Sequence, residues 1–178
     1  MKKIIFELVL NLCISSSFSH HIEVFNMTKE NTDTVIITLD STYTKDIIFK
    51  RAKEWILYNY NTPSKVIKAE INNEYIRING INKSVAKVNV LAYIDLDYIM
   101  TIDVKDGKYR LIVSINEILC NMKDCGYGFY YGSMFKKDGS IKGYYTNWVS
   151  GINTNLNATN LSLYKYIISE SKSNKNEW

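Results

Sequence analysis

The stretch Thr44–Asn61, TKDIIFKRAKEWILYNYN, carries the strongest helical pattern of this 178-residue chain. Thr44 is suited to cap the first turn, and an acid at Asp46 is favoured there by the helix dipole. Pro63, the chain's single proline, marks the end of the helix. Apolar residues recur at helical spacing along one face. We therefore predict an amphipathic helix that packs on a sheet and buries Ile48, Ala52, Trp55 and Ile56.

The clearest strand signal lies between Asp97 and Ile115. Two alternating segments, DYIMTIDV and YRLIVSI, flank KDGK, which predicts a hairpin with a two-residue turn at Asp106-Gly107. A turn of this length fixes the register and places Asp103 opposite Arg110, a pair worth about 0.2–1 kcal/mol. The expected core pairs are Val104–Tyr109, Ile102–Leu111, Met100–Val113 and Tyr98–Ile115, so Met100, Ile102, Leu111 and Val113 join the predicted core.

Further strands are predicted on both sides of this hairpin. The β-branched run at 34–39 reads as one strand. Residues 66–71 and 74–78 read as a hairpin about Asn72-Asn73, in which Ala69 faces Ile76 and Ile67 faces Ile78. Residues 85–94 alternate again, either as another strand or as the outer part of a longer one.

A final helix is predicted after the strands. Asn157 is the predicted N-cap, and the apolar stripe of the helix is Leu161, Tyr164, Ile167 and Ile168. These elements predict an α+β domain in which both helices cover one face of an antiparallel sheet, in the order β-α-β-β-β-β-α.

Four quoted segments carry a family resemblance: IIFKRAKEWI at 47–56, SKVIK at 64–68, IRINGI at 76–81 and YIMTIDVKDGKYRLIVSINEI at 98–118. Together they resemble the domain of unknown function 4468, over about 35–118 and again over 157–178. That resemblance implies a curved, TBP-like antiparallel sheet with helices on one face, in a protein exported by a bacterium. The family has no agreed activity, so it assigns no active-site residue to this chain.

The first 19 residues have the layout of a secretory signal, with Lys2 and Lys3 before an apolar run and small residues near Ser19. Glu7 and Asn11 interrupt that run, which leaves the first helix of a cytosolic protein as the alternative. We expect export to the periplasm, the cell surface or the medium, with membrane contact only through this signal. The expected organisation is signal peptide 1–19, flexible arm 20–33, a single domain 34–168 and a polar tail 169–178.

Absent residue types exclude several chemistries. His20 and His21, at the start of the expected mature chain, are the only histidines, so a Ser-His-Asp, Cys-His or histidine-zinc site inside the domain is excluded. The chain has neither a phosphate-binding P-loop nor a dinucleotide fingerprint. Asp95 and Asp97 are candidate paired carboxylates, although a solvated strand entrance explains them better. We expect no enzymatic activity, no cofactor and no metal site.

The net charge of +4 is spread along the chain without a basic run, so we expect no nucleic-acid partner. Cys120 and Cys125 are spaced for a small disulfide loop in an exported protein, and two free thiols are the alternative. The partner itself is unknown from the sequence, and a cell-surface glycan or peptide is the leading candidate.

A Tyr/Gly-rich insert at 121–153 holds six of the eight glycines, among many aromatic residues. Its segment YYGSMFKKDGSIKGYYTNW, at 130–148, also resembles one copy of the aromatic hairpins of cell-wall- and choline-binding repeats. Exposed rings bind sugar faces well, whereas rings buried at the sheet edge would be structural. The candidate ligand-binding residues are Tyr130, Tyr131, Tyr144, Tyr145 and Trp148.

The favoured hypothesis is an exported, non-catalytic binding or accessory module. The first alternative is a cell-surface protein that binds glycan or peptide through the Tyr/Gly-rich hairpin. The second is an enzyme whose carboxylate site has no recognisable motif.

Overall fold

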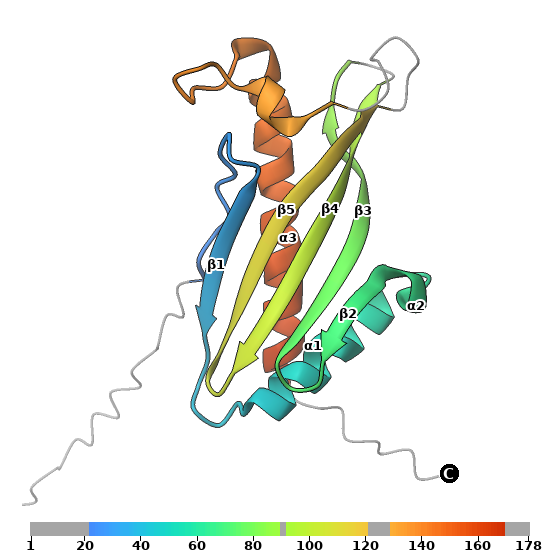
Figure 1. The fold of residues 1–178 in the computed structure, drawn as a ribbon, viewed down its shortest axis with the longest axis vertical. Helices are drawn as coiled ribbons and strands as arrows, with labels where there is room; N and C mark the ends of the chain where they lie inside the picture. Colours follow the sequence, from blue (N-terminus) through green and yellow to red (C-terminus); the bar gives the residue numbers. More distant parts are fainter. Residues whose placement is uncertain (1–21, 90–91, 121–128, 170–178) are drawn as a thin grey trace, which may run out of the picture.

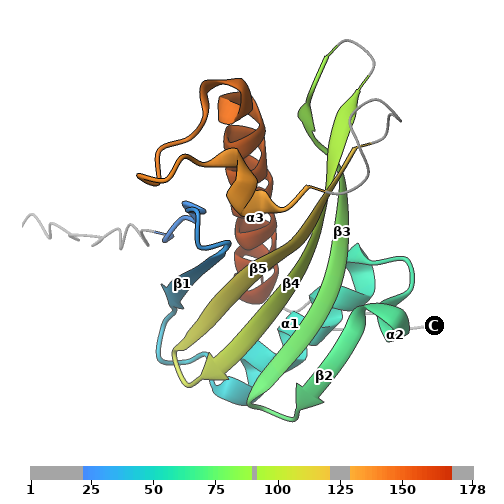
Figure 2. The ribbon, with the colours of Figure 1, turned by 45° about the horizontal axis from the view of Figure 1, so that its top comes forward.

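The computed structural model describes residues 22–89, 92–120 and 129–169. It contains an open, five-stranded antiparallel sheet in the order β1-β5-β4-β3-β2, with α1 and α3 on one face (Figures 1 and 2). The elements are β1 (Thr32–Thr38), α1 (Lys45–Asn59), α2 (Pro63–Val66), β2 (Ile67–Ile71), β3 (Tyr75–Lys87), β4 (Tyr93–Lys105), β5 (Lys108–Cys120), the 3₁₀ turns η2 (Tyr131–Met134) and η3 (Gly143–Tyr145), and α3 (Thr146–Ile168). Apart from the single-turn α2, this is the predicted order of strands and helices.

The β4–β5 hairpin has the predicted register. All four expected pairs form, from Val104↔Tyr109 to Tyr98↔Ile115, and their side chains are buried. Gly107 takes a φ of +69°, which glycine adopts without a steric penalty. On the opposite face Arg110 Nε and Nη2 donate to Asp103 Oδ2 at 2.9 and 2.5 Å.

The turn of this hairpin also holds the start of α1. Asp106 Oδ1 accepts a hydrogen bond from the Lys45 N–H at 2.7 Å, while Thr44 Oγ1 accepts from the Ile47 N–H at 3.4 Å. The Gly107 N–H donates to the Tyr43 carbonyl at 2.8 Å. The predicted cap at Thr44 is therefore confirmed, and a second acceptor comes from the hairpin.

The buried face of α1 is the predicted one. Ile48, Ala52, Trp55 and Ile56 are all buried, and Phe49 joins them. Trp55 is only 2% exposed, and its Nε1–H donates to Ser162 Oγ on α3 at 3.0 Å. The two helices are thus joined across the layer that covers the sheet.

The predicted register of the β2–β3 hairpin is partly wrong. Ile67 pairs with Ile78 as expected, but Ala69 pairs with Arg77, and Ile76 lies opposite Glu70. The loop holds three residues instead of two, because Asn73 adopts a φ of +58°, and a register shift follows in β2.

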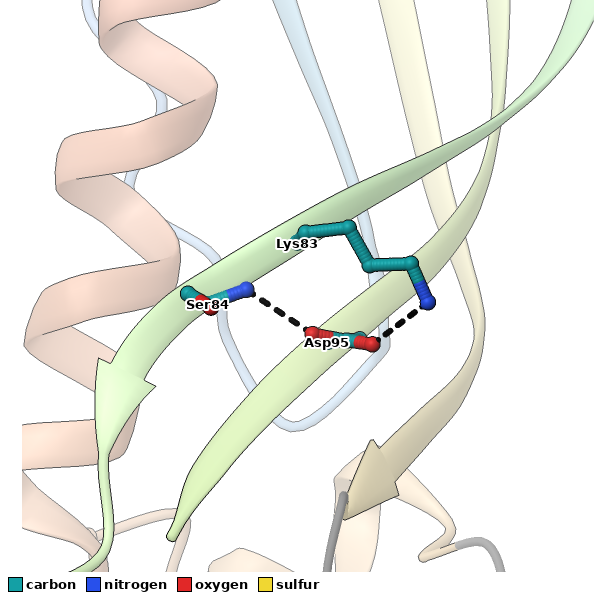
Figure 3. A network of polar contacts seen from close by, with 3 residues as sticks. All are labelled: Lys83, Ser84 and Asp95. Carbon is teal, nitrogen blue, oxygen red and sulfur yellow. Dashed lines mark hydrogen bonds and ion pairs between the residues drawn. The ribbon is translucent and has the colours of Figure 1, made fainter. Parts of the chain in front are cut away.

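Strand β3 continues far beyond 78 to Lys87, so the segment 85–94 is shared between the end of β3 and the start of β4. The register shifts between Asn82 and Ala86, where Ser84 takes a φ of +55°. Figure 3 shows how Asp95 fixes this irregularity: its carboxylate accepts from the Ser84 N–H at 2.8 Å and from Lys83 Nζ at 2.7 Å. We call the segment Lys83–Val85 the β3 bulge.

Helix α3 begins at Thr146, so the prediction of a helix start at Asn157 is wrong. Leu161 and Ile168, assigned to the apolar stripe, are 39% and 37% exposed, while Tyr164 and Ile167 are buried as expected. The early turns contain Gly151 and several asparagines, which are poor helix formers. Packing against β3 stabilises them, and this contact is invisible in the local sequence.

The predicted flexible arm is also corrected over the described residues 22–31. Phe25 and Met27 are each 2% exposed and belong to the hydrophobic core. This segment lies beside β1 and α3 (Figures 1 and 2) and is bonded to asparagine side chains of α3. Its two core residues lie among polar residues such as Glu23, Asn26 and Thr28, so the sequence of this segment resembles that of a solvated arm.

Candidate functional site

The five candidate ligand-binding residues of the insert do not form one exposed surface. Tyr130 and Tyr144 are 65% and 76% exposed, Tyr145 is half-buried, and Tyr131 and Trp148 are buried. Tyr131 and Trp148 therefore follow the alternative of buried, structural rings, whereas Tyr130 and Tyr144 present their rings to solvent. The remaining part of the insert, at 121–128, lies outside the described residues.

Most of these rings pack against one another. Trp148, at the start of α3, makes ring contacts with Phe129 at 6.0 Å and with Tyr145 at 5.2 Å between centroids. Phe129 in turn forms a β-bridge with Ile118 in β5. Aromatic pairs of this geometry add to the burial energy, so the cluster fastens α3 to the end of the sheet.

The two candidate carboxylates point to the same face of β4 but have separate partners. Asp95 is bonded to the β3 bulge, and Asp97 Oδ1 accepts from the Asn116 Nδ2 at 3.0 Å. The described residues contain no group of three or more His, Cys, Asp or Glu side chains placed to hold a metal ion. The geometry gives both acids a role in strand pairing.

Cys120, the last residue of β5, is disulfide-bonded. Cys125, its predicted partner, lies outside the described residues.

A partly buried chain of polar side chains links the helices to the sheet. The Tyr60 and Tyr98 hydroxyls lie 2.8 Å apart, Tyr98 donates to Asn82 Oδ1 at 3.2 Å, and Asn82 Nδ2 donates to Asn155 Oδ1 at 2.5 Å. Burial raises the pKa of Tyr98, and burial together with Tyr98 raises that of Tyr60. Because these groups satisfy one another inside the core, we assign the chain a structural role.

A further candidate surface is the sheet face opposite the helices, which we call the open face. In Figure 1 both long helices lie behind the sheet, and the front of the strands carries none. One row across the open face runs Ile36, Arg110, Asp103, Tyr75 and Ile71, and the next runs Thr34, Ile112, Thr101 and Arg77.

The open face is partly apolar. Ile36, Ile71 and Ile81 are 47%, 49% and 49% exposed, whereas Ile99 and Ile112 are half-buried. Beside them Arg110 forms an ion pair with Asp103, and Arg77 adds a further positive charge. Strand alternation placed these residues opposite the core, but the sequence did not show that the sheet would stay uncovered there.

None of the described helices has the length and apolar content needed to span a bilayer. The structure's helical side has two shallow depressions, one along α3 beside Leu161 and Tyr166 and one between α1 and the β2–β3 turn. The second is lined by charged side chains of α1, among them Asp46, Lys50 and Glu54.

Comparisons with known proteins find a matching family model and similar solved structures. A family model described as a domain of unknown function (DUF4468) with TBP-like fold matches residues 34–116. The crystal structure of a DUF4468 family protein from Bacteroides ovatus is similar with a TM-score of 0.62 and 10% identity, covering 84% of this chain and 92% of that one. A TBP-like protein from Parabacteroides distasonis gives a TM-score of 0.60 and 14% identity, covering 76% and 91%. No curated protein matches the sequence.

At these identities the two solved structures show the fold alone. The family model and the fold agree with the resemblance seen in the sequence: residues 34–116 match the DUF4468 family model, and the structure is similar to proteins with the TBP-like fold.

Proposed function

We propose that this chain is an exported, non-catalytic binding or accessory module that contacts a partner protein through the open face of its sheet. The observation that supports the proposal is the uncovered sheet face, on which three isoleucines are about half exposed. A helix layer on one side and an exposed, partly apolar sheet on the other is an arrangement that binding modules use.

The composition of the open face favours a protein partner. Aliphatic side chains lie next to threonines, Tyr75 and one ion pair, the mixture found in non-obligate protein interfaces. Nucleic acid is disfavoured because the Arg110 charge is neutralised by Asp103 and no basic stripe crosses the strands. Long, paired strands also hold these side chains in place before binding, which lowers the entropy cost of association.

Site-specific cross-linking tests the surface. A photo-reactive residue is placed at Ile36 or Ile81 on the open face, and at Leu57, 56% exposed on α1, as the matched control. In the native host we expect one protein to cross-link from both open-face positions and not from Leu57. Ile36→Lys with Ile81→Lys should then weaken binding of that purified protein at least tenfold, while Leu57→Lys leaves it unchanged.

Equal cross-linking from both sides of the molecule would overturn the assignment of the open face. Glycan retention that is lost in a folded Tyr144→Ala variant would move the contact surface to the insert. Turnover in a substrate panel that Asp97→Asn abolishes would overturn the non-catalytic assignment.

Export has its own test. The charged start and apolar run of residues 1–19 support cleavage near Ser19. Mass spectrometry of the N-terminus from native host material should find chains that begin near His20. Intact Met1 in a cytosolic fraction would overturn this part of the proposal.

A further inference from the structure

Residues Glu23–Met27 are held against α3 in the way that a receptor holds a peptide. The Asn157 side-chain amide forms two hydrogen bonds with the backbone of Phe25. Its Oδ1 accepts from the Phe25 N–H at 2.7 Å, and its Nδ2 donates to the Phe25 carbonyl at 3.0 Å. Asn153 Oδ1 accepts from the Met27 N–H at 3.1 Å, and Asn160 Nδ2 donates to the Glu23 carbonyl at 2.9 Å.

The spacing of these asparagines on α3 explains the contact. Residues four and three apart lie on one helical face, so Asn153, Asn157 and Asn160 form a strip of amides. An extended segment presents its backbone at every second residue, and the strip contacts residues 23, 25 and 27. We call this site the asparagine groove.

Burial of two apolar side chains, Phe25 and Met27, adds specificity to these backbone contacts. Phe25 and Met27 are each 2% exposed, and the Tyr131 hydroxyl donates to the Met27 carbonyl at 3.3 Å. The opposite wall is β1, whose Ile36 N–H donates to Glu23 Oε2 at 2.7 Å. Each of these bonds involves a side chain, so the segment is bound beside the sheet and not as a sixth strand.

The resident segment leaves the asparagine groove incompletely satisfied. Asn160 is 1% exposed, and its Oδ1 has no hydrogen-bond partner among the described residues. Asn31, where the chain enters β1, adopts a φ of +66°. Its buried Oδ1 also has no hydrogen-bond partner among the described residues. A buried oxygen without a donor is destabilising, so a segment that donates a hydrogen bond to Asn160 Oδ1 would bind more tightly than residues 23–27.

We propose that the asparagine groove is a binding site for an extended segment of another protein, with apolar side chains two residues apart and a donor for Asn160 Oδ1. Residues 23–27 occupy the groove until such a segment displaces them. The same segment from a second copy of this chain would leave the same oxygen unpaired, which favours a different protein. This inference is independent of the open face.

The first experiment uses the full chain with Phe25→Ala and Met27→Ala, which weakens the resident segment and leaves the groove unchanged. Fluorescent peptides with the sequences EVFNMTKE and EVANATKE are titrated by anisotropy. We expect the first to bind at least tenfold more tightly, and Asn157→Leu in the same background to remove the difference. Equal binding of the two peptides, or full binding to the Asn157→Leu protein, would overturn the site.

A peptide series tests the unpaired oxygen. Gln, Asn, Ser or Arg, whose side chains donate hydrogen bonds, is added before the first residue of EVFNMTKE or replaces its second residue. The first residue is kept because its carboxylate accepts from the Ile36 N–H. At least one of these peptides should bind threefold more tightly than the parent, and Asn160→Leu should abolish that gain. A series in which no peptide exceeds the parent would overturn the proposal of a foreign ligand.

A second preparation covers the case in which the double variant does not fold. A protease site is inserted after Lys29 in the otherwise unchanged chain, which is folded and then cut. Labelled EVFNMTKE should exchange into the cut protein, whereas labelled EVANATKE should not. Failure of both to exchange, or self-association of the cut protein that EVFNMTKE reverses, would overturn the foreign ligand, and the latter would assign the groove to a second copy.

Discussion

Gly151 lies where α3 crosses the β3 bulge, and it leaves no room for a side chain. A Cβ at this position would be 2.6 Å from both Ala86 Cβ and the Val85 carbonyl oxygen. Because one of these neighbours is backbone, we expect Gly151→Ala to lower the free energy of unfolding by about 1–3 kcal/mol. Gly143→Ala is the matched control, since nothing lies within 4 Å of its Cβ position. Chemical denaturation of both variants measures the difference, and equal stability would contradict this account of the crossing.

Trp55 is the largest residue of α1 and is 2% exposed. Trp55→Ala should cost roughly 3–5 kcal/mol, because it removes a ring that the surrounding side chains cannot replace. Trp55→Phe keeps most of the volume and loses the bond to Ser162, so it should cost far less. Denaturant titration of the two variants checks this, and a cost below about 1 kcal/mol for Trp55→Ala would show that the site collapses without strain.

Single residues also explain why the asparagine groove was not predicted. Asn153, Asn157 and Asn160 are polar residues on a helix, and from sequence they belong on a solvated face. Asn160 is instead buried, because the segment that carries Phe25 and Met27 crosses it. The signal was available as amides at helical spacing together with apolar residues at strand spacing, but 126 to 137 residues separate the bonded partners.

Between elements, the β4–β5 turn acts on α1 through Asp106. Its carboxylate accepts from the Lys45 N–H, one of the N–H groups that a helix leaves unpaired at its start. Asp106→Ala should therefore lower stability by about 0.5–2 kcal/mol, and Asp106→Asn should lower it less because an acceptor remains. Thermal unfolding of both variants, followed by circular dichroism, measures this. An Asn variant as unstable as the Ala variant would assign the effect to charge instead of to the hydrogen bond.

The elements that were predicted correctly are those whose signals are local. The Asp106-Gly107 turn fixed the β4–β5 pairs from Val104↔Tyr109 to Tyr98↔Ile115, up to a register shift at Asp97. The spacing of Ile48 to Ile56 fixed the buried face of α1. The first turns of α3 were missed because they depend on packing against β3. The Asn72-Asn73 turn was misjudged by one residue, since either asparagine can take a positive φ and only Asn73 does.

Across the whole molecule, buried tyrosines make the free energy of unfolding depend on pH in the alkaline range. Burial raises the pKa of Tyr109, and the nearby Tyr164 adds to the effect, while burial also raises the pKa of Tyr98. The unfolded chain loses these protons near pH 10 and the folded chain keeps them, so the free energy of unfolding is constant below pH 10 and falls above it. Each such tyrosine contributes a slope of up to about 1.4 kcal/mol per pH unit.

Tyr109→Phe isolates one of these groups. The Tyr109 hydroxyl is buried with no partner in the described part of the chain, so its removal should raise stability at pH 7 and flatten the alkaline slope. Tyr98→Phe is the control, because it flattens the slope but loses bonds to Tyr60 and Asn82 at pH 7. Urea midpoints from pH 7 to pH 11 measure both effects, and a Tyr109→Phe slope equal to that of the parent would refute this assignment.

The contact between residues 23–27 and α3 joins the beginning of the domain to its end. Residues 23–27 are synthesised more than a hundred residues before the α3 residues that bind them. Phe25 and Met27 therefore lack their buried contacts while the rest of the chain is made. Strand β1 also remains unpaired at first, because its partner β5 is synthesised about 75 residues later. This fold therefore cannot be completed until its last helix has been made.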